Sequence, residues 1–504
     1  MELEMIVQDM PRQNMMKQNM LDRRGATAFG ALALTGALVL AVPSVLAAQQ
    51  VDRTTPPTLG PPPALKLPPV VVRQLPNGLK LMVVERHKLP VADFLLVVPV
   101  GATANPANEA GIAGLTAQML PEGTTTRNAL QIADQMAYLG VTLNANSGWD
   151  ATTVSLSTPT AQLDSALALF ADVALHPSFP ATEFTRNKQD RLTELLQIKD
   201  RGPAIADRVF PAIVYGTDNP YGRPASGTES SVSAMTATDV AAFYKSHFLP
   251  NSATMVIVGD VTPAEVERKI GALFGGWSKG AESAVMASTP STLPATNIYL
   301  VNKPDAAQSS FRIGGVGVPR ATPDYFPIQV MNTALGGSFT SRLNQVLREA
   351  KAYTYGASSR FETRKFAGPF VARSEVVSAK TDSALIDFMA QLRAIRDTMP
   401  TTELSKTKRY VELEMPSAFE TTGDIAQRLA DVALYGLPLD YYNNFVANID
   451  AVTQGDVQRV AQKYIDPAHM AIVIVGDSKS IEAPLKATNI APVSVRNIDG
   501  KPVP

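Results

Sequence analysis

Histidines are the first side chains to weigh for hydrolytic chemistry, and this sequence contains few of them. The four are His87, His176, His247 and His469, scattered singly through 504 residues. Neither His-Glu-Xaa-Xaa-His nor His-Xaa-Xaa-Glu-His occurs, so no two imidazoles stand one helical turn apart to bind zinc. Each histidine is therefore interpreted as a surface or turn residue.

Other catalytic patterns are equally sparse. The absence of cysteine excludes disulfides, thiol nucleophiles and cysteine-bound metals. Ser147, Ser226 and Ser338 lie near glycines, but no Gly-Xaa-Ser-Xaa-Gly turn and no neighbouring base accompany them. Paired carboxylates for glycoside chemistry would need a fold that this sequence does not indicate. A metal-independent hydrolase is thus poorly supported.

Length and composition indicate how many domains the chain should form. With 45% hydrophobic and 18% charged residues, the chain is too long for a single core and too apolar for disorder, so two or more domains are expected. The formal net charge is −1, and no Lys/Arg cluster with interleaved aromatics is visible. Nucleic-acid binding is not expected.

The N-terminal region predicts export. Arg23 and Arg24 precede an Ala/Leu/Val-rich run over 26–42 and a small-residue cleavage site near Ala47, so residues 1–48 are assigned as signal peptide and leader. An uncleaved helix is the alternative, Met16 or Met20 could be the start, and the paired arginines leave twin-arginine export open. An exported chain without cysteine suits the periplasm, with no stable membrane anchor. Residues 49–69 are read as a Pro-rich tether.

Local patterns predict alternating strands and helices after Val70. Two strands are expected within 71–85, around the turn at Asn77 and Gly78, and another over 94–100. Helices are expected within 111–124 and over 128–139, 161–175 and 181–198, the last with Thr182 as its N-cap.

An internal repeat organises the chain. Residues 235–260 align without a gap with residues 452–477, and both copies end in Val-Ile-Val-Gly-Asp. Two chance copies of a common helix–strand unit are the alternative, but the shared register across loop, helix and strand favours duplication. We therefore predict a first domain over 70–280, a linker over 281–296, a second domain over 297–484 and a C-terminal tail over 485–504. Helices are expected at 237–246 and 454–464.

From Leu75 to Asp477 the order of these features resembles the pitrilysin family, the inverted zincins related to insulin-degrading enzyme and the mitochondrial processing peptidase. The resemblance implies an α+β fold. Two homologous domains, each a mainly antiparallel sheet with helices packed on one face, would form half of a clam-shaped peptidase.

The resemblance also locates an erased metal site. In active members the helix equivalent to 111–124 carries His-Xaa-Xaa-Glu-His, which binds zinc and supplies a general base. Here those positions are Gly114, Ala117 and Gln118, and our alignment places Asn187 at the third metal ligand. None of the first three can do that chemistry. No cofactor is expected on this chain, and zinc is expected in a partner subunit.

By the same resemblance the second domain keeps the family's Arg/Tyr segment. Arg348 and Tyr355 take the places of the paired arginine and tyrosine that hydrogen-bond substrate and stabilise the oxyanion, with Tyr353 as a fallback. Peptide would bind along the strand edge at Asn144, Ala145 and Asn146. The alternative is that Arg348 is a helix-end cation and Tyr355 is half-buried sheet packing.

This combination resembles the non-metal subunit of two-chain bacterial peptidases. It predicts a heterodimer with a homologous zinc-binding subunit, acting on peptides and inactive alone. A catalytically inactive peptide-binding or scaffolding protein, perhaps homodimeric, is the alternative.

Overall fold

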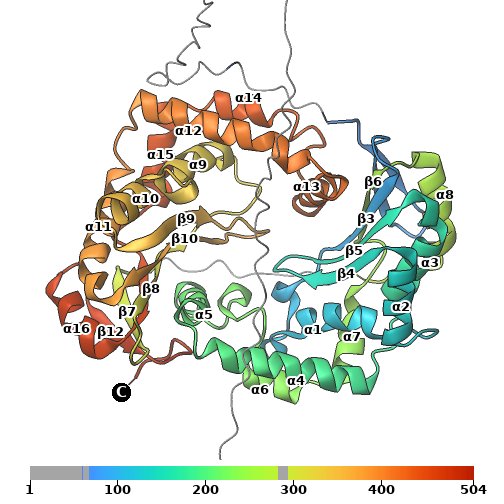
Figure 1. Ribbon diagram of the computed structural model, residues 1–504, viewed down its shortest axis with the longest axis horizontal. Coiled ribbons are helices and arrows are strands. Elements are labelled where there is room, and N and C mark those ends of the chain that lie inside the picture. Colours follow the sequence, from blue (N-terminus) through green and yellow to red (C-terminus); the bar gives the residue numbers. More distant parts are fainter. Residues whose placement is uncertain (1–59, 61–66, 282–292, 504) are drawn as a thin grey trace, which may run out of the picture. The chain divides into compact units, whose positions relative to one another are not determined.

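The strands form two six-stranded sheets of matching design (Figure 1). The computed structural model describes residue 60 and residues 67–281 and 293–503, so the predicted signal peptide and most of the tether and linker lie outside the described residues. The first sheet runs β1-β2-β6-β3-β5-β4 and the second β12-β7-β11-β8-β10-β9. The strands of the first sheet are β1 (Val71–Gln74), β2 (Lys80–Glu85), β3 (Val91–Val98), β4 (Thr142–Ser147), β5 (Thr152–Pro159) and β6 (Thr254–Gly259). Those of the second are β7 (Asn297–Asn302), β8 (Gln308–Val316), β9 (Thr354–Phe361), β10 (Pro369–Val377), β11 (Ala471–Gly476) and β12 (Val493–Arg496).

Strand pairing is mainly antiparallel, and it repeats between the halves. β2 pairs parallel to β6, as β7 does to β11, and in each sheet three further strands then follow in antiparallel order. β4 and β9 are equivalent edge strands, each hydrogen-bonded on one side only. The duplication read from the sequence therefore extends to topology, and the α+β fold of two homologous domains is confirmed.

The helices begin close to where the sequence patterns place them. Those of the first half are α1 (Ile112–Met119), α2 (Ala129–Leu139), α3 (Leu163–Leu175), α4 (Ala181–Ile198), α5 (Gly202–Tyr215), α6 (Glu229–Ala234), α7 (Ala237–His247) and α8 (Pro263–Phe274). Those of the second are α9 (Tyr325–Asn332), α10 (Arg342–Asn344), α11 (Thr381–Ala394), α12 (Thr401–Glu414), α13 (Thr422–Tyr435), α14 (Phe445–Asp450), α15 (Gln454–Tyr464) and α16 (Ser478–Ala487), with π-helical turns η6 (Thr333–Gly337) and η7 (Gln345–Ala350).

Helix caps show why the repeat is visible in the sequence. Thr236 and Thr453 each accept a hydrogen bond from the backbone of the aspartate three residues later, and that aspartate caps the threonine in return. The expected cap at Thr182 is wrong: α4 begins at Ala181 after Pro180, whose φ of −60° and ψ of 134° already give the extended geometry of an N-cap. Thr182 lies inside the first turn.

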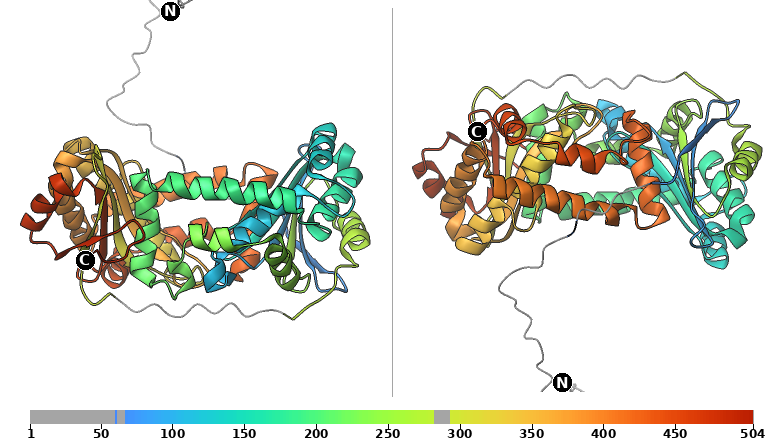
Figure 2. Two further views of the ribbon diagram at one scale, coloured as in Figure 1. Left: turned by 90° about the horizontal axis from the view of Figure 1, so that it is seen from below. Right: turned by 90° about the horizontal axis from the view of Figure 1, so that it is seen from above.

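The two halves exchange helices. α13, from the second half, packs on β3 and β6 of the first sheet, and α5, from the first half, packs on β8 and β11 of the second (Figure 1). Apolar side chains of each exchanged helix complete a buried core on that sheet face. Other helices of each half, such as α1 and α3 in the first and α9 and α11 in the second, lie against their own sheet. Figure 2 shows the two sheets at opposite ends, with helices running across between them. Each domain core therefore depends on the other half of the chain.

In the part of the chain that the structure describes, no helix is long and apolar enough to cross a membrane.

Candidate functional site

The helix expected to have lost its metal ligands is α1, which lies next to the edge strand β4. It starts after Gly111, whose φ of 102° is left-handed and whose absent Cβ would stand 2.9 Å from the carbonyl oxygen of Ser226. Ala117 is fully buried, while Gly114 and Gln118 are half-buried on the side that faces α4. Gly114 and Gln118 therefore face Arg191 of α4.

Arg191 of α4 fills the space above these positions. Its Nη2 donates to Oε1 of Gln118 at 3.0 Å, its Nη1 donates to the carbonyl oxygen of Ser226 at 3.2 Å, and its Nε donates to Oε2 of Glu194 at 3.0 Å. A Cβ added at Gly114 would lie 3.6 Å from Nη1. With only 9% of the residue exposed, the guanidinium is a fixed, largely buried cation.

This donor set does not fit zinc. Gly114 and Ala117 carry no ligand atom, and the amide oxygen of Gln118 is already held by a permanently charged guanidinium, which would repel a metal cation. Across residues 67–281 and 293–503, no group of three or more His, Asp or Glu side chains is arranged to hold a metal ion. No catalytic step through zinc can be derived for this chain.

Asn187 lies one turn before Arg191 on α4. Its Nδ2 donates to the carbonyl oxygen of Glu183 at 3.0 Å, within its own helix. The assignment of Asn187 to the third metal-ligand position stays a prediction, and the contact with Gln118 is made by Arg191 instead. Sequence reasoning missed Arg191, although its spacing of four from Asn187 places both on one helix face.

The Arg/Tyr segment occupies η7 and the start of β9. Arg348 stacks on Phe339, with Cζ 4.1 Å from the ring centroid, and its Nε lies 3.6 Å from Oε1 of Glu349. Tyr355 is 92% exposed, whereas Tyr353 is half-buried and packs against the core of the second domain. In this part of the described chain no hydrogen bond joins Arg348 to Tyr355: Tyr355 faces solvent, and Arg348 is held by Phe339 and Glu349.

The expected peptide-binding strand is an open edge. β4 pairs only with β5, in a register that sets Asn144 opposite Ser155 and Asn146 opposite Thr153. Asn144 and Asn146 are exposed and Ala145 is half-buried. An edge strand with free main-chain groups can accept an extended peptide as a further strand.

The four histidines lie in separate segments of the described structure, and none belongs to α1. His87 is exposed, with Nδ1 2.7 Å from Oδ1 of Asp260 and Nε2 3.2 Å from Oε2 of Glu85. Hydrogen bonds from the His87 ring to the carboxylates of Asp260 and Glu85 raise the pKa of His87 above its usual range. His176 is exposed near Asp172 and His469 is half-buried beside Asp466. His247, the last residue of α7, is half-buried and stacks on Phe243, so it is neither a surface nor a turn residue.

The fold defines a class of protein: a duplicated α+β scaffold of two six-stranded sheets, in which a buried arginine of α4 packs against α1. Residues 81–229 match the family model described as insulinase (peptidase family M16), and residues 234–411 match that described as peptidase M16 inactive domain. The chain belongs to the M16, or pitrilysin, family of peptidases.

Relatives agree with this placement. An uncharacterized zinc protease of Mycobacterium leprae is 30% identical over 288 residues, which cover 56% of this chain and 64% of that protein, less than two thirds of its length. An uncharacterized zinc protease of Rickettsia felis is 23% identical over 80% of this chain and 97% of that one. A crystal structure of a peptidase M16 inactive domain from Pseudomonas fluorescens matches at a TM-score of 0.76 and 27% identity, over 81% of this chain and 98% of that one.

Proposed function

We propose that this chain is the non-zinc-binding subunit of a heterodimeric metallopeptidase. A homologous partner subunit would bind zinc and supply the catalytic base. This chain would contribute Arg348 and Tyr355, which bind the peptide and stabilise the oxyanion. The carrying observation is the contrast between its two domains. In the first domain, Arg191 of α4 hydrogen-bonds Gln118 of α1, the helix equivalent to the zinc-binding helix of active members. In the second, Tyr355 is almost fully exposed at the start of an edge strand.

Chemistry favours the assignment of roles. A guanidinium is a permanent cation and a phenol is a hydrogen-bond donor, and both suit a growing negative charge on a carbonyl oxygen. Arg348 is already oriented by the ring of Phe339, so less side-chain freedom is lost when substrate binds. The substrate class is therefore a peptide in extended conformation, held by main-chain hydrogen bonds along β4 or its counterpart in the partner.

The compartment belongs to the same proposal. The sequence around Arg23 to Ala47 has the pattern of a signal peptide, so the heterodimer is placed in the periplasm. The partner is then expected to be an exported relative that carries His-Xaa-Xaa-Glu-His.

The test is peptide hydrolysis by the purified chain, by its His-Xaa-Xaa-Glu-His relative from the same genome, and by an equimolar mixture. Size-exclusion chromatography is run on each sample. Activity and a larger species in the mixture alone are the expected result. Full activity of the relative alone, without complex formation, would refute the shared site and favour a separate peptide-binding or scaffolding protein.

A further inference from the structure

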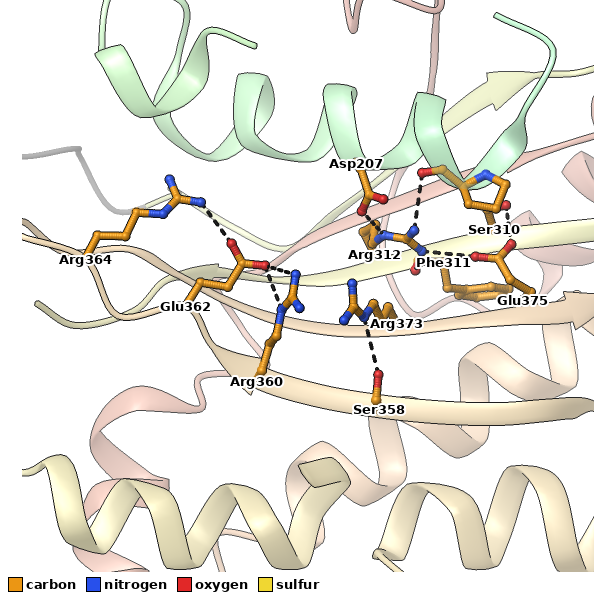
Figure 3. A network of polar contacts seen from close by, with 11 residues as sticks. Asp207, Ser310, Phe311, Arg312, Ser358, Arg360, Glu362, Arg364, Arg373 and Glu375 are labelled. Carbon is orange, nitrogen blue, oxygen red and sulfur yellow. Dashed lines mark hydrogen bonds and ion pairs between the residues drawn. The ribbon is translucent and has the colours of Figure 1, made fainter. Parts of the chain in front are cut away.

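A row of arginines crosses the face of the second sheet on which α5 packs. Arg312 of β8 and Arg373 of β10 are paired in register, and Arg373 is paired in turn with Ser358 of β9. Arg360 lies two residues after Ser358 on the same strand, so its side chain shares this face. Figure 3 shows Arg373 lying between Arg312 and Arg360.

The outer arginines are neutralised by carboxylates. Nε of Arg312 donates to Oδ1 of Asp207 on α5 at 2.6 Å, and its Nη1 donates to Oε1 of Glu375 at 3.2 Å. Glu362 accepts from both Arg360 and Arg364, at 2.7 Å from Nε of Arg360 and 2.9 Å from Nη2 of Arg364. Three carboxylates thus pair with three of the four guanidinium groups.

Arg373 is the cation left over. Its Nε donates to the Ser358 hydroxyl at 3.4 Å, and among the described residues no carboxylate lies within ion-pair distance of it (Figure 3). Burial lowers the pKa of Arg373 and the charges of Arg360 and Arg312 lower it further, while the carboxylates of Asp207 and Glu362 act in the opposite direction. The half-buried guanidinium therefore has cations and more distant carboxylates around it, but no carboxylate in direct contact.

The position of α5 leaves this charge reachable. α5 packs on β8 and β11, where it supplies the Asp207 carboxylate and buries Arg312 to 4% exposure. α5 also contacts β10, where Arg373 stays half-buried, and Arg360 on the edge strand β9 is exposed. The same strand begins at Thr354, directly before Tyr355.

We propose that Arg373, assisted by Arg360, binds a carboxylate of the peptide, either its C-terminal carboxylate or an Asp or Glu side chain. The inference rests on the proposed function in one respect, namely that the ligand is a peptide. A carboxylate can accept two parallel hydrogen bonds from a guanidinium, which fixes its position as well as its charge. The site then selects anionic peptides and holds them beside the strand that carries Tyr355.

The experiment measures peptide binding to the purified chain without any partner, by fluorescence anisotropy. Three coumarin-capped peptides share one uncharged sequence: one with a free C-terminal carboxylate, one with an amidated C-terminus, and one amidated with a single internal Glu. Wild-type protein is expected to bind a carboxylate-bearing peptide about 5- to 20-fold more tightly than the neutral one. The arm that gains affinity identifies which carboxylate is bound.

Variants assign the effect to Arg373. Arg373→Gln is expected to abolish the preference without changing affinity for the neutral peptide. Arg268→Gln, which removes an exposed arginine on α8, is the matched control and should change nothing. Glu362→Gln removes the carboxylate that neutralises Arg360, so it should strengthen carboxylate binding. Circular dichroism confirms that each variant is folded.

Failure of this site can be told apart from failure of the heterodimer. If the chain shows no carboxylate preference, or if Arg373→Gln leaves the preference intact, the site is refuted whatever a mixture with the partner does. If the preference is present and lost in Arg373→Gln while no mixture hydrolyses peptide, the site stands and the shared peptidase fails.

Discussion

At the scale of single residues, the decisive feature is a charge placed where a metal would be needed. Arg191 uses all three of its nitrogen atoms, on Gln118, Ser226 and Glu194, so moving it aside would break three polar contacts, two of them to half-buried groups. Its presence explains why a small residue at Gly114 is compatible with the fold. Gly114 and Gln118 of α1 thus pack on a buried arginine of α4, in addition to having no imidazole donors.

Substitution of Gly114 tests that packing. Gly114→Ala adds a Cβ at an ordinary 3.6 Å from Arg191, so it should stabilise the protein by about 0.5–1 kcal/mol through helix propensity. Gly114→His must displace the guanidinium and should destabilise the protein by about 1–3 kcal/mol. Urea unfolding measures both. Equal stability of the two variants would show that Arg191 does not fill this space.

Tyr355 is tested in the reconstituted pair. Loss of one oxyanion donor lowers turnover by roughly ten- to a thousand-fold, so Tyr355→Phe should reduce kcat in that range while KM changes less. Because Tyr355 is 92% exposed, stability of this chain should not change. Tyr138→Phe on α2, where the tyrosine is 87% exposed, is the matched control. Unchanged turnover in Tyr355→Phe would assign Tyr355 no catalytic role.

At the scale of elements, much of the fold follows from local sequence. The turn at Asn77 and Gly78 and the start of α4 lie where the sequence predicts. The helices expected at 237–246 and 454–464 begin at Ala237 and Gln454, each after a reciprocal cap between a threonine and an aspartate. The cap at Thr182 was wrong because Pro180 sets the N-cap geometry without a side-chain bond. Arg191 was missed because helix periodicity does not say which neighbour a polar side chain will meet.

The junction of α9 and α15 has a predictable pH dependence. Burial alone raises the pKa of Asp324, but hydrogen bonds from Tyr464, Arg459 and Lys463 outweigh it and hold the pKa at about 2, against 3.8 for an ordinary aspartate. Because the pKa of Asp324 is lower in the folded than in the unfolded state, the ionised carboxylate stabilises the fold at pH values above the unfolded pKa of about 4. That stabilisation is lost as the pH falls from about 4 toward 2.

Asp324→Asn should therefore destabilise the protein by about 2 kcal/mol at neutral pH, and the difference from wild type should shrink below pH 4. Asp134→Asn, at an exposed position on α2, is the control and should have little effect. Urea unfolding at a series of pH values provides the measurement. A difference that stays constant with pH would contradict the role of the Asp324 carboxylate.

At the scale of the whole molecule, the exchange of α5 and α13 makes the halves interdependent. Neither α5 nor α13 is among the helices expected from the sequence. Amphipathic periodicity would in any case mark an apolar face without identifying the sheet that it covers. The domain limits at 280 and 297 stay predictions. They do not separate two hydrophobic cores, because two of the core clusters contain residues from both halves of the chain. Edge strands β4 and β9 were likewise visible as strands, while their unpaired edges depend on sheet order.

Asp150, of the first half, makes polar contacts with residues of the second half. Its buried carboxylate accepts from the Tyr221 hydroxyl at 2.9 Å, from the Lys365 backbone N–H at 2.7 Å and from the Tyr435 hydroxyl of α13 at 3.3 Å. In Asp150→Asn an amide N–H₂ would face one of these donors, so a loss of about 2–3 kcal/mol is expected, with exposed Asp397→Asn as control. Because each half completes the other's core, unfolding followed by tryptophan fluorescence and by circular dichroism should coincide in wild type and variant, with only the midpoint lowered. Separate transitions for the two probes in wild-type protein would show that the halves fold independently despite sharing helices.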